Sequence, residues 1–419
     1  MHKPTTAVLH YTAPPTVGGV EAVIKHHAQA FANAGYPLTI VAGRGEPEAL
    51  PEGTEFIHVP EIASRHPEVL EVTNALRAGR VPEHFAALSA QIEERLGPIL
   101  QRFDNVIVHN VLTKEFNIPL TAALFRLLDQ GTLHNCIAWS HDFAWTSPTW
   151  EEKVHPGRPW DLLRTYREEV TYVVVSEDRQ AELAELFDCP PEEIRVVYNG
   201  VDPQLILGLT DEGYALIKRL ELLQDDVIIL MPVRVTKAKN IELALEVVAA
   251  LKARDARPRL ILTGPPDPHD EESMGYFEEL QALRKKLGVE REMRFVFESG
   301  PQPDEPYTIG DEVVGDLYSV SDVMFMPSHR EGFGMPVLEA GLAGIPVVST
   351  DVPAAEEIGR DAVAVFDAAL PAEEIAEAIH EWAQASAVHR MRCRVRRRYT
   401  WEAIFHRDIK PLLQQGGGR

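Results

Sequence analysis

Two glutamates and two glycines in one short stretch are the residues best suited to chemistry in this sequence. The stretch reads Glu331-Gly-Phe-Gly-Met-Pro-Val-Leu-Glu339 and follows the apolar, strand-like segment Asp322–Met326. Gly332 and Gly334 remove side chains where a loop enters a helix. Backbone N–H groups and the positive end of the helix can therefore approach an anion such as phosphate.

The two carboxylates, with seven residues between them, suit hydroxyl groups. An ionised carboxylate only accepts hydrogen bonds, so it pairs well with the hydroxyls of a sugar. A ligand with phosphate in the middle and hydroxyls at both ends is a nucleotide sugar. The alternative is a tight turn whose glutamates are solvated or cap the helix, and these residues alone leave it open.

A pair of cations occupies another predicted loop, between the strand Val227–Pro232 and the helix Ile241–Lys252. Arg234 and Lys239 are five residues apart, so both head groups could reach one diphosphate at the start of the helix. The alternative is that they are surface cations of a loop.

Near the N-terminus, the segment Thr16–Glu21 contains a Gly-Gly pair between the strand Ala7–His10 and the helix Ala22–Ala34. Ligands of open α/β sheets bind beyond the carboxyl ends of the strands. Gly19 is therefore a candidate for backbone contact with a phosphate or an acceptor, although such turns also serve ordinary chain geometry.

Histidines lie at the ends of two further predicted strands. His109 is the last residue of Asn105–His109, and His141 directly follows Cys136–Ser140. Imidazole suits hydrogen bonding and proton transfer near neutral pH, so His141 could bind a sugar hydroxyl, unless it is a structural histidine. His109 and Asn110 are candidate acceptor-side residues. Three nearby tryptophans are either a sugar-stacking wall or a local core: Trp145, Trp150 and Trp160.

Short apolar runs alternate with amphipathic helical segments through most of the chain, which predicts α/β units with parallel sheets. The 419 residues exceed one ordinary domain, and the alternation pauses between residues 203 and 225, so we expect two units. The other predicted strands are Leu38–Ala42, Tyr172–Ser176, Arg259–Thr263, Arg294–Glu298 and Pro346–Thr350.

The Glu331–Glu339 stretch, followed by Gly344-Ile-Pro-Val-Val348, resembles the Glu-x7-Glu signature of the retaining glycosyltransferases of family 4. The resemblance implies the B-type fold, in which two Rossmann-like α/β domains with parallel sheets face each other across a cleft. It implies an acceptor-side domain over residues 1–204, completed by a C-terminal helix at 399–415 that crosses back, and a nucleotide-sugar donor domain over 205–398.

The resemblance also assigns roles to residues. Glu331 would hold the donor hexose and Glu339 the ribose, while Arg234 and Lys239 would clamp the diphosphate near Gly19. His141 would contact the hexose, so the catalytic set is His141, Glu331, Arg234 and Lys239. The remaining donor-binding residues are Gly332, Phe333, Gly334 and Met335.

Two departures from the family pattern accompany these assignments. Pro232 stands where the family often has glycine, and the loop Phe297–Tyr307, which lies where the nucleotide base is expected, is longer than usual. The longer loop leaves the base specificity open.

Composition narrows the cellular context and the partners. The net charge of −23 argues against nucleic acid, and no run of about 18 apolar residues could span a membrane. Three scattered cysteines and the absence of a secretory leader predict a cytoplasmic protein with reduced thiols and without a structural zinc, and the family resemblance implies that no metal ion or cofactor is needed. The arginine run 390–398 is either a partner for acidic residues or a contact for an anionic acceptor or lipid surface, and the first interpretation is favoured.

Together these observations predict a metal-independent, retaining glycosyltransferase. It would move a hexose from a nucleotide-diphosphate sugar, of the UDP-glucose or GDP-mannose type, to a hydroxyl-bearing acceptor. Two alternatives are a nucleotide-sugar-binding protein without catalysis and a B-type nucleotide-sugar epimerase.

Overall fold

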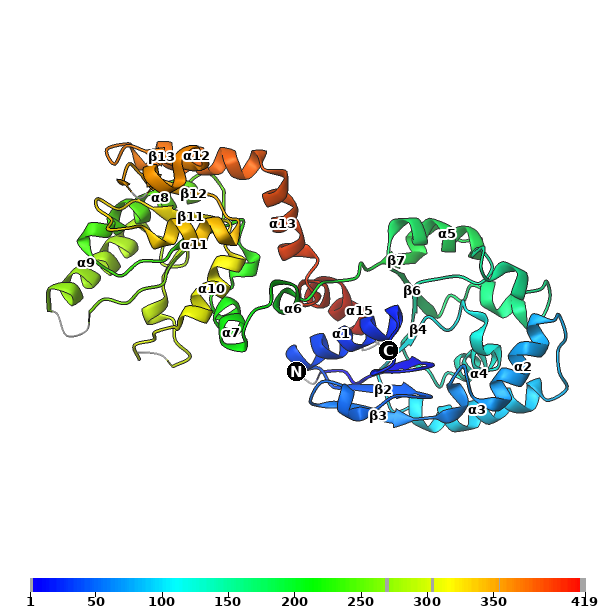
Figure 1. The fold of residues 1–419 in the computed structure, drawn as a ribbon. Coiled ribbons are helices and arrows are strands. Elements are labelled where there is room, and N and C mark those ends of the chain that lie inside the picture. The colour runs from blue at the N-terminus through cyan, green and yellow to red at the C-terminus, as the bar shows by residue number, and fades with distance from the viewer. Residues whose placement is uncertain (1–2, 268–270, 303–304, 354, 415–419) are drawn as a thin grey trace. The chain divides into compact units, whose positions relative to one another are not determined.

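The computed structural model describes residues 3–267, 271–302, 305–353 and 355–414. The chain divides into two compact units, shown in Figure 1. The N-terminal unit comprises Met1–Gly200 with Trp401–Arg419, and the C-terminal unit comprises Val201–Thr400. The sequence-based boundaries were residues 204 and 398, and residue 415 of the predicted terminal helix lies outside the described part of the chain.

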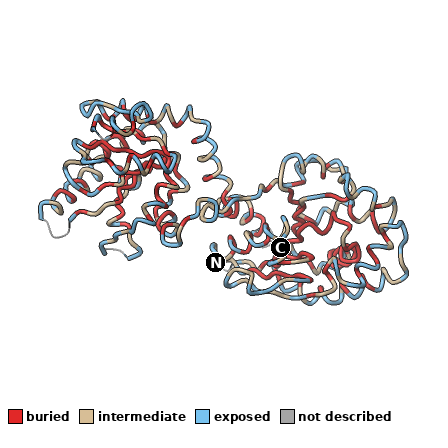
Figure 2. The backbone as a smooth tube through the Cα atoms, in the orientation of Figure 1, coloured by how far each residue is buried: buried red, intermediate tan, exposed pale blue. Residues whose placement is uncertain are grey.

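The N-terminal unit contains a sheet of seven parallel strands in the order β3-β2-β1-β4-β5-β6-β7. Every residue of β1, β2, β4 and β5 is buried, as continuous apolar runs in a parallel sheet require. Figure 2 shows the same burial along the strands. The strands are β1 (Thr6–His10), β2 (Leu38–Ala42), β3 (Thr54–His58), β4 (Asn105–His109), β5 (Cys136–Ser140), β6 (Val170–Val174) and β7 (Ile194–Val196).

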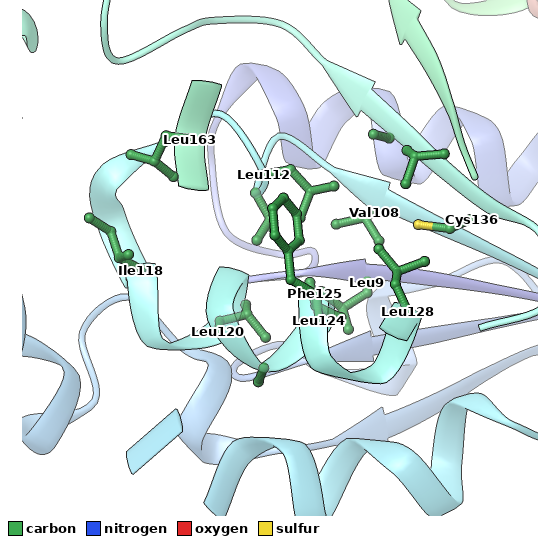
Figure 3. Close-up of a cluster of buried hydrophobic side chains, with 14 of the residues drawn as sticks. Leu9, Val108, Leu112, Ile118, Leu120, Leu124, Phe125, Leu128, Cys136 and Leu163 are labelled. Carbon is green, nitrogen blue, oxygen red and sulfur yellow. The ribbon is translucent and has the colours of Figure 1, made fainter. Parts of the chain in front are cut away.

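Helices cover this sheet and bury their apolar sides against it. Figure 3 shows part of this core, where Leu124 and Phe125 of α4 lie close to Leu9 of β1 and Val108 of β4. The helices are α1 (Gly19–Asn33), α2 (Pro67–Arg77), α3 (Phe85–Leu100), α4 (Ile118–Asp129) and α5 (Glu177–Phe187). Ser176 caps α5 by accepting a hydrogen bond from the Arg179 N–H.

The end of the chain returns to the N-terminal unit. Here α14 (Trp401–Ile404), a π-helical turn (Phe405–Ile409) and α15 (Lys410–Gln414) pack beside α1. The Phe405 ring meets that of Phe31 edge-on, with 5.1 Å between the centroids, and Trp401 is buried with its ring stacked on His26. Trp401 is therefore a packing residue.

The C-terminal unit contains six parallel strands in the order β10-β9-β8-β11-β12-β13. The strands are β8 (Val227–Met231), β9 (Pro258–Leu262), β10 (Met293–Phe295), β11 (Val323–Met326), β12 (Val347–Thr350) and β13 (Val363–Phe366). The helices are α6 (Pro203–Leu207), α7 (Asp211–Arg219), α8 (Ile241–Lys252), α9 (Glu271–Leu287), α10 (Asp311–Val320), α11 (Met335–Ala343), α12 (Ala372–Ala385) and α13 (Ala387–Arg398). The predicted strand Arg294–Glu298 is shorter than expected, because a 3₁₀ turn occupies Val296–Glu298.

The arginine run lies on α13, and much of it contacts the acidic groups that precede β8 and β11. Arg396 is buried and donates to both carboxylate oxygens of Asp322, at 3.1 and 3.0 Å. Arg397 pairs with Asp226, and Arg392 donates to the Ser319 carbonyl. These contacts match the interpretation of the run as a partner for acidic residues. None of the described helices has the length and apolarity needed to cross a membrane.

Candidate functional site

Two predicted site residues meet at the carboxyl ends of β8 and β11, which are neighbouring parallel strands. Lys239, in the loop after β8, donates to Glu331 Oε1 at 2.7 Å, and the two side chains are 20% and 8% exposed. Parallel pairing places both loops at one edge of the sheet, so residues 92 positions apart in sequence form an ion pair. The structure thus brings together the proposed phosphate clamp and the proposed hexose ligand.

Ser328 adds a second hydrogen bond to the same carboxylate. Its hydroxyl donates to Glu331 Oε1 at 2.6 Å, and its carbonyl accepts from Thr350 Oγ1, also at 2.6 Å. Ser328 is fully buried. Both donors bind one oxygen of Glu331, so the carboxylate is oriented and no described residue hydrogen-bonds to Oε2.

Tyr318, from α10, positions the second glutamate. Its hydroxyl donates to Glu339 Oε2 at 2.7 Å. Burial raises the pKa of Tyr318 well above its ordinary value, and the Glu339 carboxylate raises it further, so the phenol stays protonated and remains a donor. Both glutamates of the Glu-x7-Glu stretch are therefore held by a neighbouring side chain.

The loop between Glu331 and α11 leads directly into the N-terminus of the helix. Gly334 is the N-cap residue of α11 and adopts φ +84°, a left-handed conformation that favours glycine. Gly332 has open space where a Cβ would lie, so packing does not require a glycine there. Phe333 and Met335 are 63% and 52% exposed, and Arg234 is also exposed, so these residues are accessible to a ligand.

In the N-terminal unit, the Gly-Gly pair opens α1 just beyond β1. A Cβ at Gly18 would lie 2.1 Å from Glu21 Oε2, whereas a Cβ at Gly19 would meet nothing within 4 Å. Gly18 therefore allows Glu21 to fold back, where it accepts a hydrogen bond from Thr12 Oγ1. Because Gly19 has no side chain, none covers the N-terminus of α1 at this position.

The predicted histidines lie in a buried ring cluster at the ends of β4 and β5. His109 Nε2 is 3.3 Å from His27 Nδ1, and the centroids of the His109 and His141 rings are 5.6 Å apart. Burial lowers the pKa of His141 to about 4 and that of His27 to about 3, and it lowers the pKa of His109 well below the ordinary value. The cluster is therefore neutral at physiological pH.

His109 itself is fully buried, with its ring stacked on Trp139 at 5.5 Å between centroids. Because its side chain is enclosed by other rings, it lies behind His141 rather than on a surface that an acceptor could touch. His141 is partly exposed and remains the histidine that could contact a ligand.

Asn110 orders the loop that carries His141. It adopts φ +47°, and its Oδ1 accepts hydrogen bonds from the backbone N–H groups of His141 and Asp142 at 3.1 and 3.2 Å. The left-handed conformation suits asparagine. Asn110 thus acts on His141 through the backbone.

The tryptophans predicted as either a stacking wall or a local core pack against the core of the N-terminal unit. Trp160 is buried and accepts the Trp145 indole N–H with its carbonyl at 3.2 Å. Trp150 meets Phe116 edge-on, with 5.0 Å between centroids. These contacts match the local-core interpretation.

Two residues that contact the predicted glutamates were not predicted. Ser328 and Tyr318 donate to Glu331 and Glu339, and only Ser328, three positions before Glu331, had a sequence signal, its closeness to the motif. Parts of the loops 263–272 and 297–307, at residues 268–270 and 303–304, lie outside the described part of the chain.

Comparison with known proteins identifies the family. The model of the glycosyl transferases of group 1 matches residues 215–398, and that of glycosyltransferase family 4 matches residues 17–205. The two matches together span most of the chain and support a glycosyltransferase of group 1. The family resemblance drawn from the Glu331–Glu339 stretch is thereby confirmed, as is the two-unit α/β architecture.

The curated proteins similar to this chain share limited sequence identity with it. An uncharacterised glycosyltransferase of Methanocaldococcus jannaschii is 28% identical over 339 residues, which span 77% of this chain and 80% of the relative. Mannosylglucosylglycerate synthase of Petrotoga mobilis is 25% identical over 60% of each chain. A D-inositol 3-phosphate glycosyltransferase of Streptomyces griseus is 31% identical over 44% of this chain and 40% of its own. Among solved structures, sucrose-phosphate synthase from Thermosynechococcus elongatus covers 100% of both chains at 16% identity, with a TM-score of 0.39.

Proposed function

We propose that this glycosyltransferase moves a hexose from a nucleoside-diphosphate sugar to a hydroxyl-bearing acceptor, with retention of the anomeric configuration and without a metal ion. The observation that carries the proposal is the Lys239–Glu331 ion pair beside the N-terminus of α11. It combines a cation for phosphate, an oriented carboxylate for sugar hydroxyls and a helix end at one edge of one sheet.

The donor would bind across this edge. Lys239 and Arg234 would neutralise the diphosphate, while the backbone amides that open α11 would donate to it. Glu331, oriented by Ser328, would accept hydrogen bonds from the hexose through its second oxygen, and Glu339 would accept from the ribose. Gly19 and His141 of the N-terminal unit are proposed to contact the diphosphate and the hexose, respectively.

Catalysis would be mainly electrostatic. Negative charge develops on the departing β-phosphate, and fixed cations and a helix end stabilise that charge more in the transition state than in the bound donor. We propose that the acceptor hydroxyl attacks from the face the diphosphate leaves and that the departing phosphate takes its proton. Because His141 is neutral, it can hydrogen-bond to the hexose without pairing as a cation with the phosphate.

The relatives with described names support the substrate class. Mannosylglucosylglycerate synthase is named for a product with mannosyl and glucosyl groups, and D-inositol 3-phosphate glycosyltransferase is named for a hydroxyl-bearing acceptor. The mannosyl and glucosyl groups support a donor of the UDP-glucose or GDP-mannose type, which we propose for this chain.

The test is the release of nucleoside diphosphate from UDP-, GDP- and ADP-sugars, with and without polyol and sugar acceptors. We expect acceptor-dependent release from one donor and an unchanged anomeric configuration in the product by NMR. Tight donor binding without release would favour a non-catalytic binding protein. Conversion of the donor into an isomer without an acceptor would favour an epimerase.

A further inference from the structure

Lys114 of the N-terminal unit is a buried cation without a carboxylate partner among the described residues. It lies in the loop between β4 and α4 and is 2% exposed. It forms no hydrogen bond or ion pair with a described residue, and its ammonium lies against two rings, 5.0 Å from the Phe116 centroid and 4.6 Å from the Trp150 centroid. Buried charges are normally paired, so an ammonium whose protein contacts are aromatic faces suggests that another group supplies the acceptor.

A second lysine shares the same indole ring. The Lys153 ammonium is 3.8 Å from the Trp150 centroid and also forms no ion pair with a described residue. Burial lowers the pKa of Lys114; Glu115 and Asp142 raise it, and Lys153 lowers it further. Two like charges beside one ring favour an anion between or beside them, because their mutual repulsion is then relieved.

The carboxylate nearest in sequence already has a partner. Glu115 is 1% exposed, and its Oε1 accepts from Arg77 Nη2 at 3.1 Å. Its Oε2 and the hydroxyl of Tyr11 are buried and lack hydrogen-bond partners. The rings of Tyr11 and Phe116 are 5.9 Å apart between centroids. The Tyr11 residue, with its unpaired hydroxyl, and the Lys114 ammonium therefore both contact the Phe116 ring.

The Lys114 loop adjoins the loop that carries His141. Thr113 Oγ1 donates to the Asp142 carbonyl at 2.9 Å, and the Ala144 N–H donates to the Thr113 carbonyl at 2.9 Å. These bonds join the segments that follow the neighbouring strands β4 and β5. Lys114 and His141 therefore belong to one edge of one sheet.

We propose that Lys114, assisted by Lys153, binds an anionic group of the acceptor, a phosphate monoester or a carboxylate. The inference rests on the proposed function, which it deepens by naming the acceptor class: a hydroxyl compound that carries a negative charge. Tyr11, whose ring meets that of Phe116, is proposed to donate a further hydrogen bond to that group, and Glu115 Oε2 to accept one from a hydroxyl beside it.

The experiment measures anion binding by calorimetry with UDP, GDP or ADP saturating the donor site, so that added anions do not bind there. The probes are inorganic phosphate, glycerol 3-phosphate and D-glycerate, with glycerol as the uncharged comparison. We expect the wild type to bind at least one anion and Lys114→Met to bind it about 10-fold or more weakly, as loss of one charge-assisted contact predicts. Lys114→Arg should retain most of the affinity.

Lys25→Met, which removes an exposed lysine from α1, is the matched control and should leave anion binding unchanged. If Lys114→Met does not fold, Lys153→Met serves in its place, with an expected loss of about 3-fold. Equal anion binding in wild type and Lys114→Met, or none in the wild type, overturns the inference. Failure of the wild type to bind any nucleotide would instead count against the proposed donor site, and the anion titration would then be run without nucleotide.

Discussion

The edges at the carboxyl ends of the strands differ in charge between the two sheets. In the C-terminal unit, the edge at β8 and β11 carries charged groups that already have partners, Lys239 with Glu331 and Tyr318 with Glu339. In the N-terminal unit, the edge at β4 and β5 carries buried, neutral histidines and one unpaired lysine.

This difference indicates two ways of preparing a binding surface. The paired charges hold their side chains in position, and a donor would exchange one partner for another. At the histidine edge, burial keeps the imidazole rings neutral near pH 7, so a ligand there meets neutral histidines beside the ammonium of Lys114. A transferase that must bind a diphosphate on one surface and present a neutral hydroxyl on another has use for both.

The largest effect expected from the comparison is an acid instability confined to the N-terminal unit. His27 and His141 have folded pKa values of about 3 and about 4, against 6.5 in the unfolded chain. Protons therefore bind the unfolded state first as the pH falls below 6.5, and stability present above that pH is lost towards pH 4. The loss is about 1.4 kcal/mol per pH unit for each such histidine.

Hydrogen exchange followed by mass spectrometry at several pH values measures this loss. Peptides from β1, β4 and β5 should lose protection between pH 6.5 and about pH 4.5 before peptides from β8 and β11 do. The matched variant is His27→Gln. The slope of its unfolding free energy against pH should be smaller than that of the wild type by about one proton, whatever the stability of the variant at pH 7. An unchanged slope, or earlier opening of β8 and β11, would contradict the account.

The next largest effect is on donor turnover and concerns the edge at β8 and β11. Glu331→Ala and Lys239→Ala should each reduce turnover of the sugar donor by at least ~10-fold, because each removes a charge-assisted contact worth about 1.5–3 kcal/mol. Steady-state release of nucleoside diphosphate measures it, and Lys25→Met is the control. Wild-type turnover in both variants would show that this edge is not the donor site.

The smallest effect tests positioning. Tyr318→Phe removes the bond to Glu339 and should weaken nucleoside diphosphate binding about 3- to 10-fold, while Tyr318→Phe combined with Glu339→Gln should be little worse than Glu339→Gln alone. Calorimetry measures both. Tyr276→Phe removes an equivalent bond, 2.7 Å long, to Glu242 and serves as the control. Additive losses in the double variant would mean that Tyr318 acts independently of Glu339.

The sequence predicted the local structure around Glu331–Glu339 well because its signals are close together in the chain. The strand β11, the Gly334 turn and the start of α11 follow from an apolar run, glycine and proline, all local signals. Tyr318 was missed because it belongs to α10, 21 positions before its partner, where a tyrosine is equally consistent with ordinary packing.

The N-terminal unit was harder to interpret for the same reason. His27 and His109 are 82 positions apart, so their contact depends on sheet topology rather than on spacing. Edge strands were also missed: β3 and β7 in this unit and β13 in the other lie at sheet edges and are mostly not buried, so they are not the buried apolar runs typical of a parallel sheet. Lys114 sits among polar residues in sequence, and only the fold shows that it is buried.

The return of the chain end to α1 has a consequence for synthesis. The 200 residues of the C-terminal unit are translated between the two parts of the N-terminal unit, which takes about 10–40 s at typical bacterial rates. During that interval Phe31 and His26 lack Phe405 and Trp401, so the first unit to leave the ribosome is the last to be completed. A chaperone or a transient partner that shields the bare side of α1 would have its greatest effect in that interval.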